Sequence, residues 1–200
     1  MRASLLVLAV LIPGEGRGVV FADPLKGKPA EGWTWLREHP GHWRPSDRGL
    51  EIRVEPGKAE TVKNALVRPA PDRSKGKYAI EVTVEFTAPP TNQYEQGGIT
   101  WYQGDKPVFK LVHEHIDGKD YVIPGKKPAD DRQVRLRLIV SADEFVAQYR
   151  IGESGDFQTA DTKKVPAGAN EKVSIQCYQG PPDAEHWVRF SDFKITELPR

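Results

Sequence analysis

Alternation of apolar and polar side chains is the feature that most constrains the fold of this chain. Residues 78–86 place Ile80, Val82, Val84 and Phe86 on one face of an extended segment, opposite Glu81, Thr83 and Glu85. Residues 132–140 largely repeat the pattern, with Val134, Leu136, Leu138 and Val140 opposite Gln133, Arg135 and Arg137. Such a period of two places successive side chains on opposite faces of a half-buried β-strand. Because no segment shows a convincing helical period, the sequence predicts an all-β protein.

Shorter segments of the same kind recur along the chain, separated by turn-forming residues. The further expected strands are 50–54, 65–69, 98–103, 108–116, 120–123, 145–150, 173–177 and 188–190. The separators include Glu55-Pro56-Gly57 and Asp117-Gly118-Lys119, whose glycine, proline and aspartate residues favour tight turns. Ten or more short strands joined in this way predict one antiparallel sandwich of two packed sheets.

The N-terminus has the pattern of a secretory signal. Arg2 provides a positive charge, residues 4–12 form a short apolar run, and Val20-Phe21-Ala22 is a small-residue cleavage pattern. We therefore expect residues 1–22 to be a signal peptide and residues 23–200 to be one mature domain. This predicts an exported protein, periplasmic or extracellular, without membrane contact after cleavage. The alternatives are a retained N-terminal anchor and an unprocessed tail.

Charge and motif content disfavour several classes of function. The chain has 29 basic and 28 acidic residues, interspersed, so it offers no basic stripe for nucleic acid. Its single cysteine, Cys177, excludes an intrachain disulfide and lies among alternating apolar residues, which is typical of a core thiol. No Gly-x-Ser-x-Gly motif and no phosphate-binding glycine loop is present. The sequence predicts no cofactor and does not specify an oligomeric state.

Aromatic residues and glycines along the chain resemble those of a known family. Residues 33–52 read W-x-W-L-R-E-x-P-x-x-W-x-x-x-x-x-G-L-x-I; residues 96–102 read QGGITWY, and a strand over 108–115 is followed by Asp117-Gly118. This order resembles the domain-of-unknown-function 1349 family, whose yeast member is described as a regulator of enolase. More broadly, it is similar to the concanavalin A-like jelly rolls found beside family-43 β-xylosidases. The resemblance implies a lectin/glucanase-type β-sandwich of two curved antiparallel sheets, one of them concave, and implies no activity.

Catalytic carboxylates of the glucanase type are missing from the sequence. Those enzymes place acidic residues in an E-x-D-x-E arrangement along one strand, and retaining hydrolysis needs two carboxyl groups roughly 5–5.5 Å apart. Here Glu81 and Glu85 share a face, but Thr83 stands between them. The sequence therefore favours a binding protein over a hydrolase, and leaves the question of an enzyme open.

His113-Glu114-His115 is the strongest local motif for metal binding. On a strand, His113 and His115 point to one face, and a metal would need a third ligand, for which His186 is the candidate. The alternatives are structural histidines or a strand in which Glu114 is the residue that contacts a ligand. Asp117 and Asp120 provide too few oxygens for calcium, and a hairpin turn explains Asp117-Gly118 equally well.

Aromatic and hydrogen-bonding side chains on the solvent side of the expected concave strands are the better candidates for a site. Aromatic rings stack on the apolar faces of sugars, and amide, guanidinium and carboxylate groups give directional hydrogen bonds. The predicted ligand-binding residues are Tyr102, Glu114, Gln176, Tyr178, Trp187 and Arg189. They predict a non-catalytic domain that recognises a carbohydrate or glycoside. The alternatives are a diverged glycoside hydrolase, a family-43 accessory-type domain, and a protein-interaction module. The three N-terminal tryptophans, Trp33, Trp35 and Trp43, are expected to be structural.

Overall fold

The computed structural model describes residues 18–199, which form strands and connecting loops and no helix. The strands are β1 Gly18–Asp23, β2 Thr34–Leu36, β3 Trp43–Ser46, β4 Gly49–Arg53, β5 Ala65–Pro69, β6 Lys77–Phe86, β7 Gln96–Gln103, β8 Lys106–Ile116, β9 Lys119–Ile123, β10 Lys127–Pro128, β11 Gln133–Val140, β12 Glu144–Ile151, β13 Gln158–Lys164, β14 Glu171–Tyr178 and β15 Trp187–Leu198.

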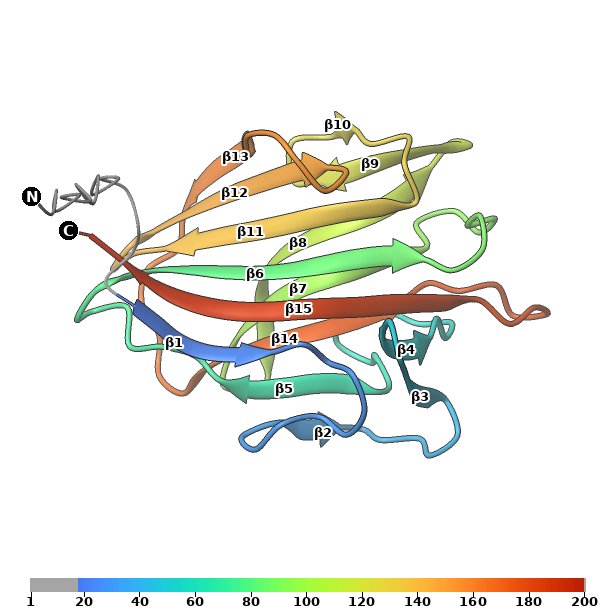
Figure 1. Cartoon of the computed structure of the whole chain (residues 1–200), viewed down its shortest axis with the longest axis horizontal. Helices are drawn as coiled ribbons and strands as arrows, with labels where there is room; N and C mark the ends of the chain where they lie inside the picture. Colours follow the sequence, from blue (N-terminus) through green and yellow to red (C-terminus); the bar gives the residue numbers. More distant parts are fainter. Residues whose placement is uncertain (1–17, 200) are drawn as a thin grey trace, which may run out of the picture.

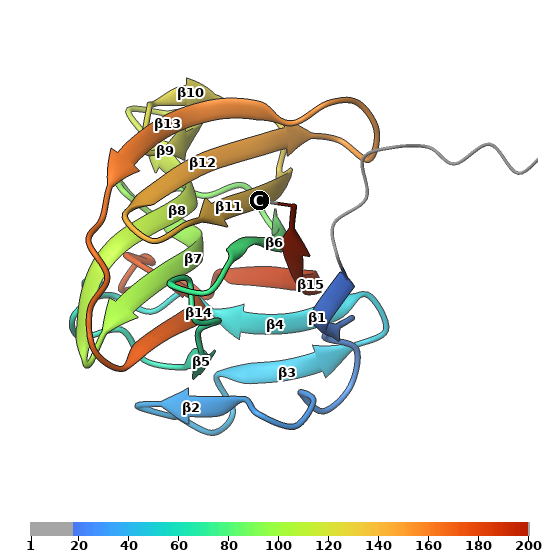
Figure 2. The ribbon, with the colours of Figure 1, turned by 90° about the vertical axis from the view of Figure 1, so that its left-hand side faces the viewer.

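These strands form two antiparallel sheets that pack face to face (Figures 1 and 2). Sheet A has the order β13-β12-β11-β6-β15-β4-β3, and β1 also pairs with β15. Sheet B has the order β10-β9-β8-β7-β14-β5-β2. In Figure 1, β1, β15, β6 and β11 of sheet A lie in front of β7, β8 and β14 of sheet B. The predicted all-β sandwich of two antiparallel sheets is confirmed.

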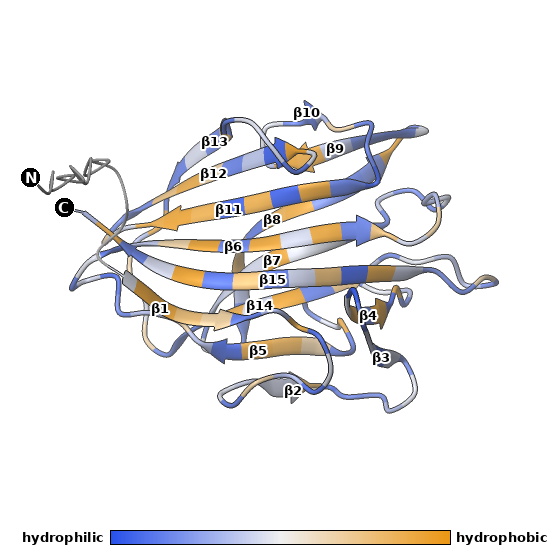
Figure 3. Cartoon of the chain, viewed as in Figure 1, coloured by the Kyte–Doolittle hydropathy of each residue, from blue (hydrophilic) through white to orange (hydrophobic). Residues whose placement is uncertain are grey.

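The core lies between the sheets and is built from the alternation seen in the sequence. Strands β6 and β11 pair so that Val84 faces Val134 and Val82 faces Leu136, and all four side chains are fully buried. Figure 3 shows the alternation of apolar and polar residues along β6, β11 and β12. Each buried aliphatic side chain of this size contributes roughly 1.5–3 kcal/mol. Cys177 belongs to this core, and burial raises the pKa of its thiol well above the ordinary value.

The N-terminal tryptophans pack at one end of the two sheets. Trp35 of β2 stacks on Trp43 of β3 with ring centroids 4.8 Å apart, so this pair joins an edge of sheet B to an edge of sheet A. Trp33 lies edge-on to Phe193 of β15, also at 4.8 Å. These contacts give the tryptophans the structural role expected from the sequence.

The boundary expected at residue 22 falls inside β1, which is antiparallel to β15. Most of the expected signal peptide, residues 1–17, lies outside the described residues. Phe21 of β1 packs near Trp33 and Phe193, with centroid distances of 6.0 and 6.1 Å. The signal peptide and the mature domain boundary therefore stay predictions. No helix in the described part of the chain is long and apolar enough to cross a membrane.

Candidate functional site

The outer face of sheet B carries an unusual set of buried polar side chains. In β7, Ile99 and Trp101 point into the core, so the residues that alternate with them point outward; β8 and β14 follow the same rule. This outer face is called here the sheet B face. Its polar and aromatic side chains on β7, β8 and β14 include Gln96, Thr100, Tyr102, Lys110, Glu114, Ser174, Gln176 and Tyr178. Polar groups removed from water need partners, so their contacts indicate what the face can do.

One cluster on this face is an ion pair extended by an amide. The Lys110 ammonium donates to Glu114 Oε2 at 2.9 Å and to Gln96 Oε1 at 2.7 Å. Gln96 Nε2 in turn donates to the Tyr94 carbonyl at 2.7 Å. The Glu114 side chain is 6% exposed and that of Lys110 is 34% exposed, so the lysine is the end of the cluster that a ligand can reach.

The register of the strands extends this cluster across the sheet. Gln96 lies opposite Glu114 on one side and opposite Tyr178 on the other, and Glu114 lies opposite Tyr121 of β9. A carboxylate and an amide therefore stand between two tyrosines in one row. Such a row combines flat apolar surface with hydrogen-bonding groups.

A second cluster surrounds the Gln176 amide. Its Oε1 accepts hydrogen bonds from the Tyr102 hydroxyl at 2.8 Å and from the Ser174 hydroxyl at 2.9 Å. Burial raises the pKa of Tyr102, and the hydrogen bond to Gln176 only partly opposes that effect, so the phenol stays a hydrogen-bond donor. Gln176 Nε2 and Thr100 Oγ1 are buried and have no hydrogen-bond partner in the protein. Each unsatisfied buried group costs about 1–3 kcal/mol.

Gly98 separates the two clusters. It lies between Gln176 and Val112 in the register of the sheet, so the middle row has no side chain at that point. A Cβ added at Gly98 would lie 2.3 Å from the Leu111 carbonyl oxygen. Glycine is therefore required for the close approach of β7 to β8.

A loop covers part of the sheet B face. Residues 55–64, called here the covering loop, place Ala59 and Val62 against Tyr178, and the Ala59 carbonyl lies 3.5 Å from the Tyr102 hydroxyl. Tyr102 and Tyr178 are consequently only 2% and 5% exposed. Gln176 and Tyr178 lie on the predicted face of their strand. The expectation that they contact solvent was wrong, because the covering loop packs over them.

Beside the covering loop the face opens into a cleft of about 340 Å³. Thr100 and Lys110 line its floor, and the remaining lining residues are Ala59, Glu60, Pro107, Val108, Phe109, Ile123, Pro124, Asp161 and Lys163. This volume falls within the range of small-molecule sites, roughly 300–1,000 Å³. The cleft gives access to the Lys110 side chain, whereas Thr100 is 1% exposed and its unpartnered hydroxyl is buried.

Trp187 and Arg189 lie on the other sheet. Both belong to β15 and point away from the core on the outer face of sheet A, where the Arg44 guanidinium lies 4.1 Å from the Trp187 ring centroid. Arg189 binds Glu51 at 2.6 Å and Glu85 at 2.7 Å. The six predicted residues therefore do not form one groove. Tyr102, Glu114, Gln176 and Tyr178 share the sheet B face, whereas the other two are on the opposite side of the sandwich because β15 pairs with β6 and β4.

The outer face of sheet A holds a larger cleft of about 710 Å³, lined mainly by charged residues. Its charges bind one another: Glu81 accepts from Arg137 at 2.9 Å and from Arg135 at 3.1 Å. Burial raises the pKa of Glu81, but the two arginines outweigh it and keep that pKa below its ordinary value. Glu85 of the same cleft is likewise paired, with Arg48 and Arg189. Because these two central carboxylates already have partners, this cleft is a weaker candidate than the sheet B face.

The histidines predicted as weak metal candidates share one face of β8, and it is the face that points to the core. His113 is fully buried beside Phe86, and its Nε2 lies 3.2 Å from the Ala129 carbonyl. Burial lowers the pKa of His113, which favours the neutral ring. His115 binds Asp120 at 2.6 Å, and His186 binds Glu95 at 2.8 Å. In the described part of the chain, neither His113 nor His115 belongs to a group of three ligating side chains.

Four of the named side chains of the sheet B face were not among the predicted site residues: Gln96, Thr100, Lys110 and Ser174. Each lies an even number of residues along its strand from a residue that was predicted: Lys110 from Glu114, Ser174 from Gln176, and Gln96 and Thr100 from Tyr102. Alternation alone could therefore have identified them. The covering loop had no signal in the sequence beyond its turn residues.

Comparison with known proteins places this chain among β-sandwiches. No protein-family model and no curated protein matches the sequence. Solved structures similar to it include the GH43 protein BlXynB from Bacillus licheniformis, with a TM-score of 0.66 and 18% identity over 88% of this chain and 39% of that one. A functionally unknown protein from Saccharomyces cerevisiae gives 0.56 and 15% over 84% and 97%. An alginate lyase from Corynebacterium gives 0.56 and 13% over 86% and 89%.

These likenesses concern the fold. The chain spans about two fifths of the Bacillus protein, at low sequence identity. Together with the order of the two antiparallel sheets, they identify the fold as a concanavalin A-like jelly-roll β-sandwich.

Proposed function

We propose that this chain is a non-catalytic carbohydrate-recognition domain of an exported protein, and that it binds a glycan on the sheet B face. The observation that carries the proposal is the pairing of two features in one place. The Lys110 side chain, which is 34% exposed, is the accessible end of the Lys110–Gln96–Glu114 cluster, and it lines a cleft of about 340 Å³. A sugar hydroxyl accepts hydrogen bonds as well as donating them, so it can accept one from the Lys110 ammonium.

Flat apolar surface for a sugar ring is available at the border of the same face. Tyr121 of β9 lies opposite Glu114, and Tyr94, whose carbonyl accepts from Gln96, is 47% exposed. The rings of these two tyrosines provide apolar surface on which a sugar ring can stack, in addition to the hydrogen bonds of the cluster. The similar structures named above include proteins described as GH43 and alginate lyase, which supports a glycan as the ligand. The finer resemblance to the domain-of-unknown-function 1349 family belongs to this proposal.

Binding is favoured over hydrolysis by the carboxylates of the face. On β7, β8 and β14, Glu114 is the carboxylate of the sheet B face, and it is paired with Lys110. Glu60 of the covering loop and Asp161 of β13 also line the cleft, on two separate elements and without the E-x-D-x-E arrangement. Glycoside hydrolysis of the usual kind needs a pair of carboxyl groups, one of which must act as an acid. A strand carboxylate held by a lysine provides an anchor for ligand hydroxyls.

A glycan panel tests the proposal. The probes are xylo-oligosaccharides, xyloglucan oligosaccharides and alginate oligosaccharides, and binding is measured by isothermal titration calorimetry alongside release of reducing sugar. We expect binding without turnover, weakened about tenfold or more in Lys110→Ala and Glu114→Gln, since a hydrogen bond to a charged group is worth roughly 1.5–3 kcal/mol.

Lys106→Ala is the matched control, because Lys106 is an exposed lysine at the start of the same strand. It should bind as the unmodified chain does. Equal binding by all three variants would move the ligand away from this face, and turnover lost in Glu114→Gln would establish the enzyme alternative. A panel without any ligand would favour a protein partner.

A further inference from the structure

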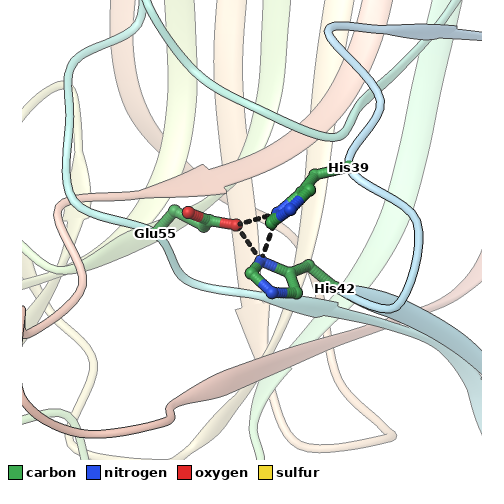
Figure 4. Close-up of side chains that lie close together, drawn as sticks. All are labelled: His39, His42 and Glu55. Carbon is green, nitrogen blue, oxygen red and sulfur yellow. Dashed lines mark hydrogen bonds and ion pairs between the residues drawn. The ribbon is translucent and has the colours of Figure 1, made fainter.

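Three potential metal ligands converge at the edge of the sandwich, and none of them belongs to the set that the sequence suggested. His39 and His42 lie in the connection between β2 and β3, and Glu55 follows β4 at the start of the covering loop. Their ligand atoms all lie within 4.8 Å of one another. Figure 4 shows the two imidazole rings and the carboxylate pointing toward a common centre.

The contacts among these atoms cannot all be satisfied by protons. His39 Nδ1 lies 2.7 Å from His42 Nδ1 and 3.3 Å from Glu55 Oε1, and His42 Nδ1 also contacts Glu55 Oε1. Each neutral imidazole nitrogen offers either one N–H or one lone pair, and an ionised carboxylate only accepts. If both Nδ1 atoms carry protons, the two N–H groups oppose each other. If one lacks a proton, its lone pair faces the Glu55 oxygen. A cation at the centre would use all three lone pairs.

The backbone fixes the three residues independently of their side chains. The His39 amide donates to Asn64 Oδ1 at 2.7 Å, and the His42 carbonyl accepts from the Arg53 amide at 2.9 Å. Glu55 is held by a hydrogen bond from the Gly180 amide to its carbonyl at 3.1 Å. A Cβ at position 180 would lie 1.8 Å from the Val54 oxygen, so only glycine permits this approach. The backbone of each ligand residue is thus already held by a hydrogen bond, which lowers the entropic cost of binding.

We propose that His39, His42 and Glu55 bind one divalent transition-metal ion, with zinc the ion best matched to the donors. Two imidazoles and one carboxylate are a known three-residue ligand set for zinc, and a fourth, open position is then taken by water. The His39 side chain is 48% exposed, so solvent reaches the cluster. The ion would connect the β2–β3 segment to the start of the covering loop and so fasten the loop over the sheet B face.

Two cations near the cluster oppose a metal ion. Arg53 Nη1 lies 3.4 Å from His42 Nε2, and Lys63 Nζ lies 3.8 Å from Glu55 Oε2. Arg53 is itself paired with Glu185 at 3.1 Å, which offsets part of its charge. Lys63→Met should therefore strengthen metal binding, because it removes a positive charge beside Glu55. This change is opposite in direction to the weaker binding expected when a ligand is replaced, and a simple hydrogen-bonded cluster would not show it.

The test uses the full chain without a histidine tag, zinc chloride as the probe, and calorimetry together with metal analysis after dialysis. We expect one zinc per chain. Zinc affinity should fall at least about tenfold in His42→Ala and in Glu55→Gln, because losing even a residue that only hydrogen-bonds a metal ligand typically costs about 10–100-fold in affinity. His115→Ala is the matched control, because His115 also pairs with a carboxylate and should leave zinc binding unchanged.

Cobalt(II) gives a second readout that needs no variant. A visible spectrum of the intensity typical of four-coordinate cobalt should appear at one equivalent and disappear when zinc is added. Absence of stoichiometric zinc binding, or binding retained in His42→Ala with native circular dichroism, overturns the proposal. Because the readout is metal binding, its failure leaves the glycan proposal untouched, and the reverse also holds.

Discussion

Arg73 is the buried charge whose replacement tests most directly how the connections at one end of the sandwich are held. Its guanidinium forms a two-pronged ion pair with Glu171, through Nε at 2.9 Å and Nη2 at 2.8 Å. Nη1 donates to the carbonyls of Ser141, Ala142 and Val165 at 2.8, 2.9 and 2.7 Å. The side chain is 1% exposed. One residue thus joins three connections that are far apart in the sequence.

We expect Arg73→Met to destabilise the protein by about 3 kcal/mol. Removing one partner of a buried ion pair typically costs roughly 3–5 kcal/mol, and the lower end applies because the Glu171 side chain is 11% exposed and can recruit water. Urea unfolding followed by tryptophan fluorescence measures the change. The double variant Arg73→Met/Glu171→Gln should be less destabilised than the sum of the two single variants, since the charge left unpaired in each is then absent.

The pH dependence gives a second measurement of the same pair. Burial raises the pKa of Glu171, but hydrogen bonds from Arg73, the Gly168 amide and Gln103 outweigh it and hold the pKa below its ordinary value of 4.5. A carboxyl with a lowered folded-state pKa stabilises the protein fully above its unfolded pKa, and this contribution is lost as the pH falls through the folded pKa. In Arg73→Met, the free energy of unfolding should therefore fall less steeply as the pH is lowered. A loss of stability below about 1 kcal/mol, together with an unchanged pH dependence at acid pH, would refute this account of the ion pair.

Three further predictions follow from the packing. Gly98→Ala should destabilise the protein by about 1–3 kcal/mol by urea unfolding, because the new Cβ would meet the Leu111 carbonyl at 2.3 Å; unchanged stability would show that β7 and β8 can separate. In the chain that retains residues 1–22, Phe21→Ala should cost about 1–3 kcal/mol through lost contacts with the Trp33 ring, and an unaffected melting temperature would mean that Phe21 does not stabilise the sandwich. Trp187→Ala should leave glycan affinity unchanged, because Trp187 lies on sheet A; weakened binding in calorimetry would place the ligand on that sheet instead.

Much of the fold could be predicted from the sequence because alternation is a local property. The pattern in 78–86 and 132–140 specified which side chains enter the core, and these two segments are neighbours as β6 and β11. The same rule placed Glu114 and Gln176 on the outer face of their strands. A period of two is set by backbone geometry within a strand and needs no knowledge of its partners.

The candidate site depended on information that the sequence does not hold. Trp187 alternates as clearly as Tyr102, but β15 pairs in sheet A and β7 in sheet B, and both sheets produce the same local pattern. Burial of Tyr178 came from Val62 in a loop remote in sequence. His39 and Glu55 meet because the chain turns back through β3 and β4.

The sequence by itself determined an all-β chain, the inward and outward faces of its main strands, and the structural tryptophans near the N-terminus. Only the tertiary structure decided which sheet each strand joined, which polar side chains the covering loop enclosed, and which histidines came together. The physical reason is that side-chain alternation follows from the backbone of one strand, whereas sheet membership and loop packing follow from hydrogen bonds and contacts between residues distant in the chain.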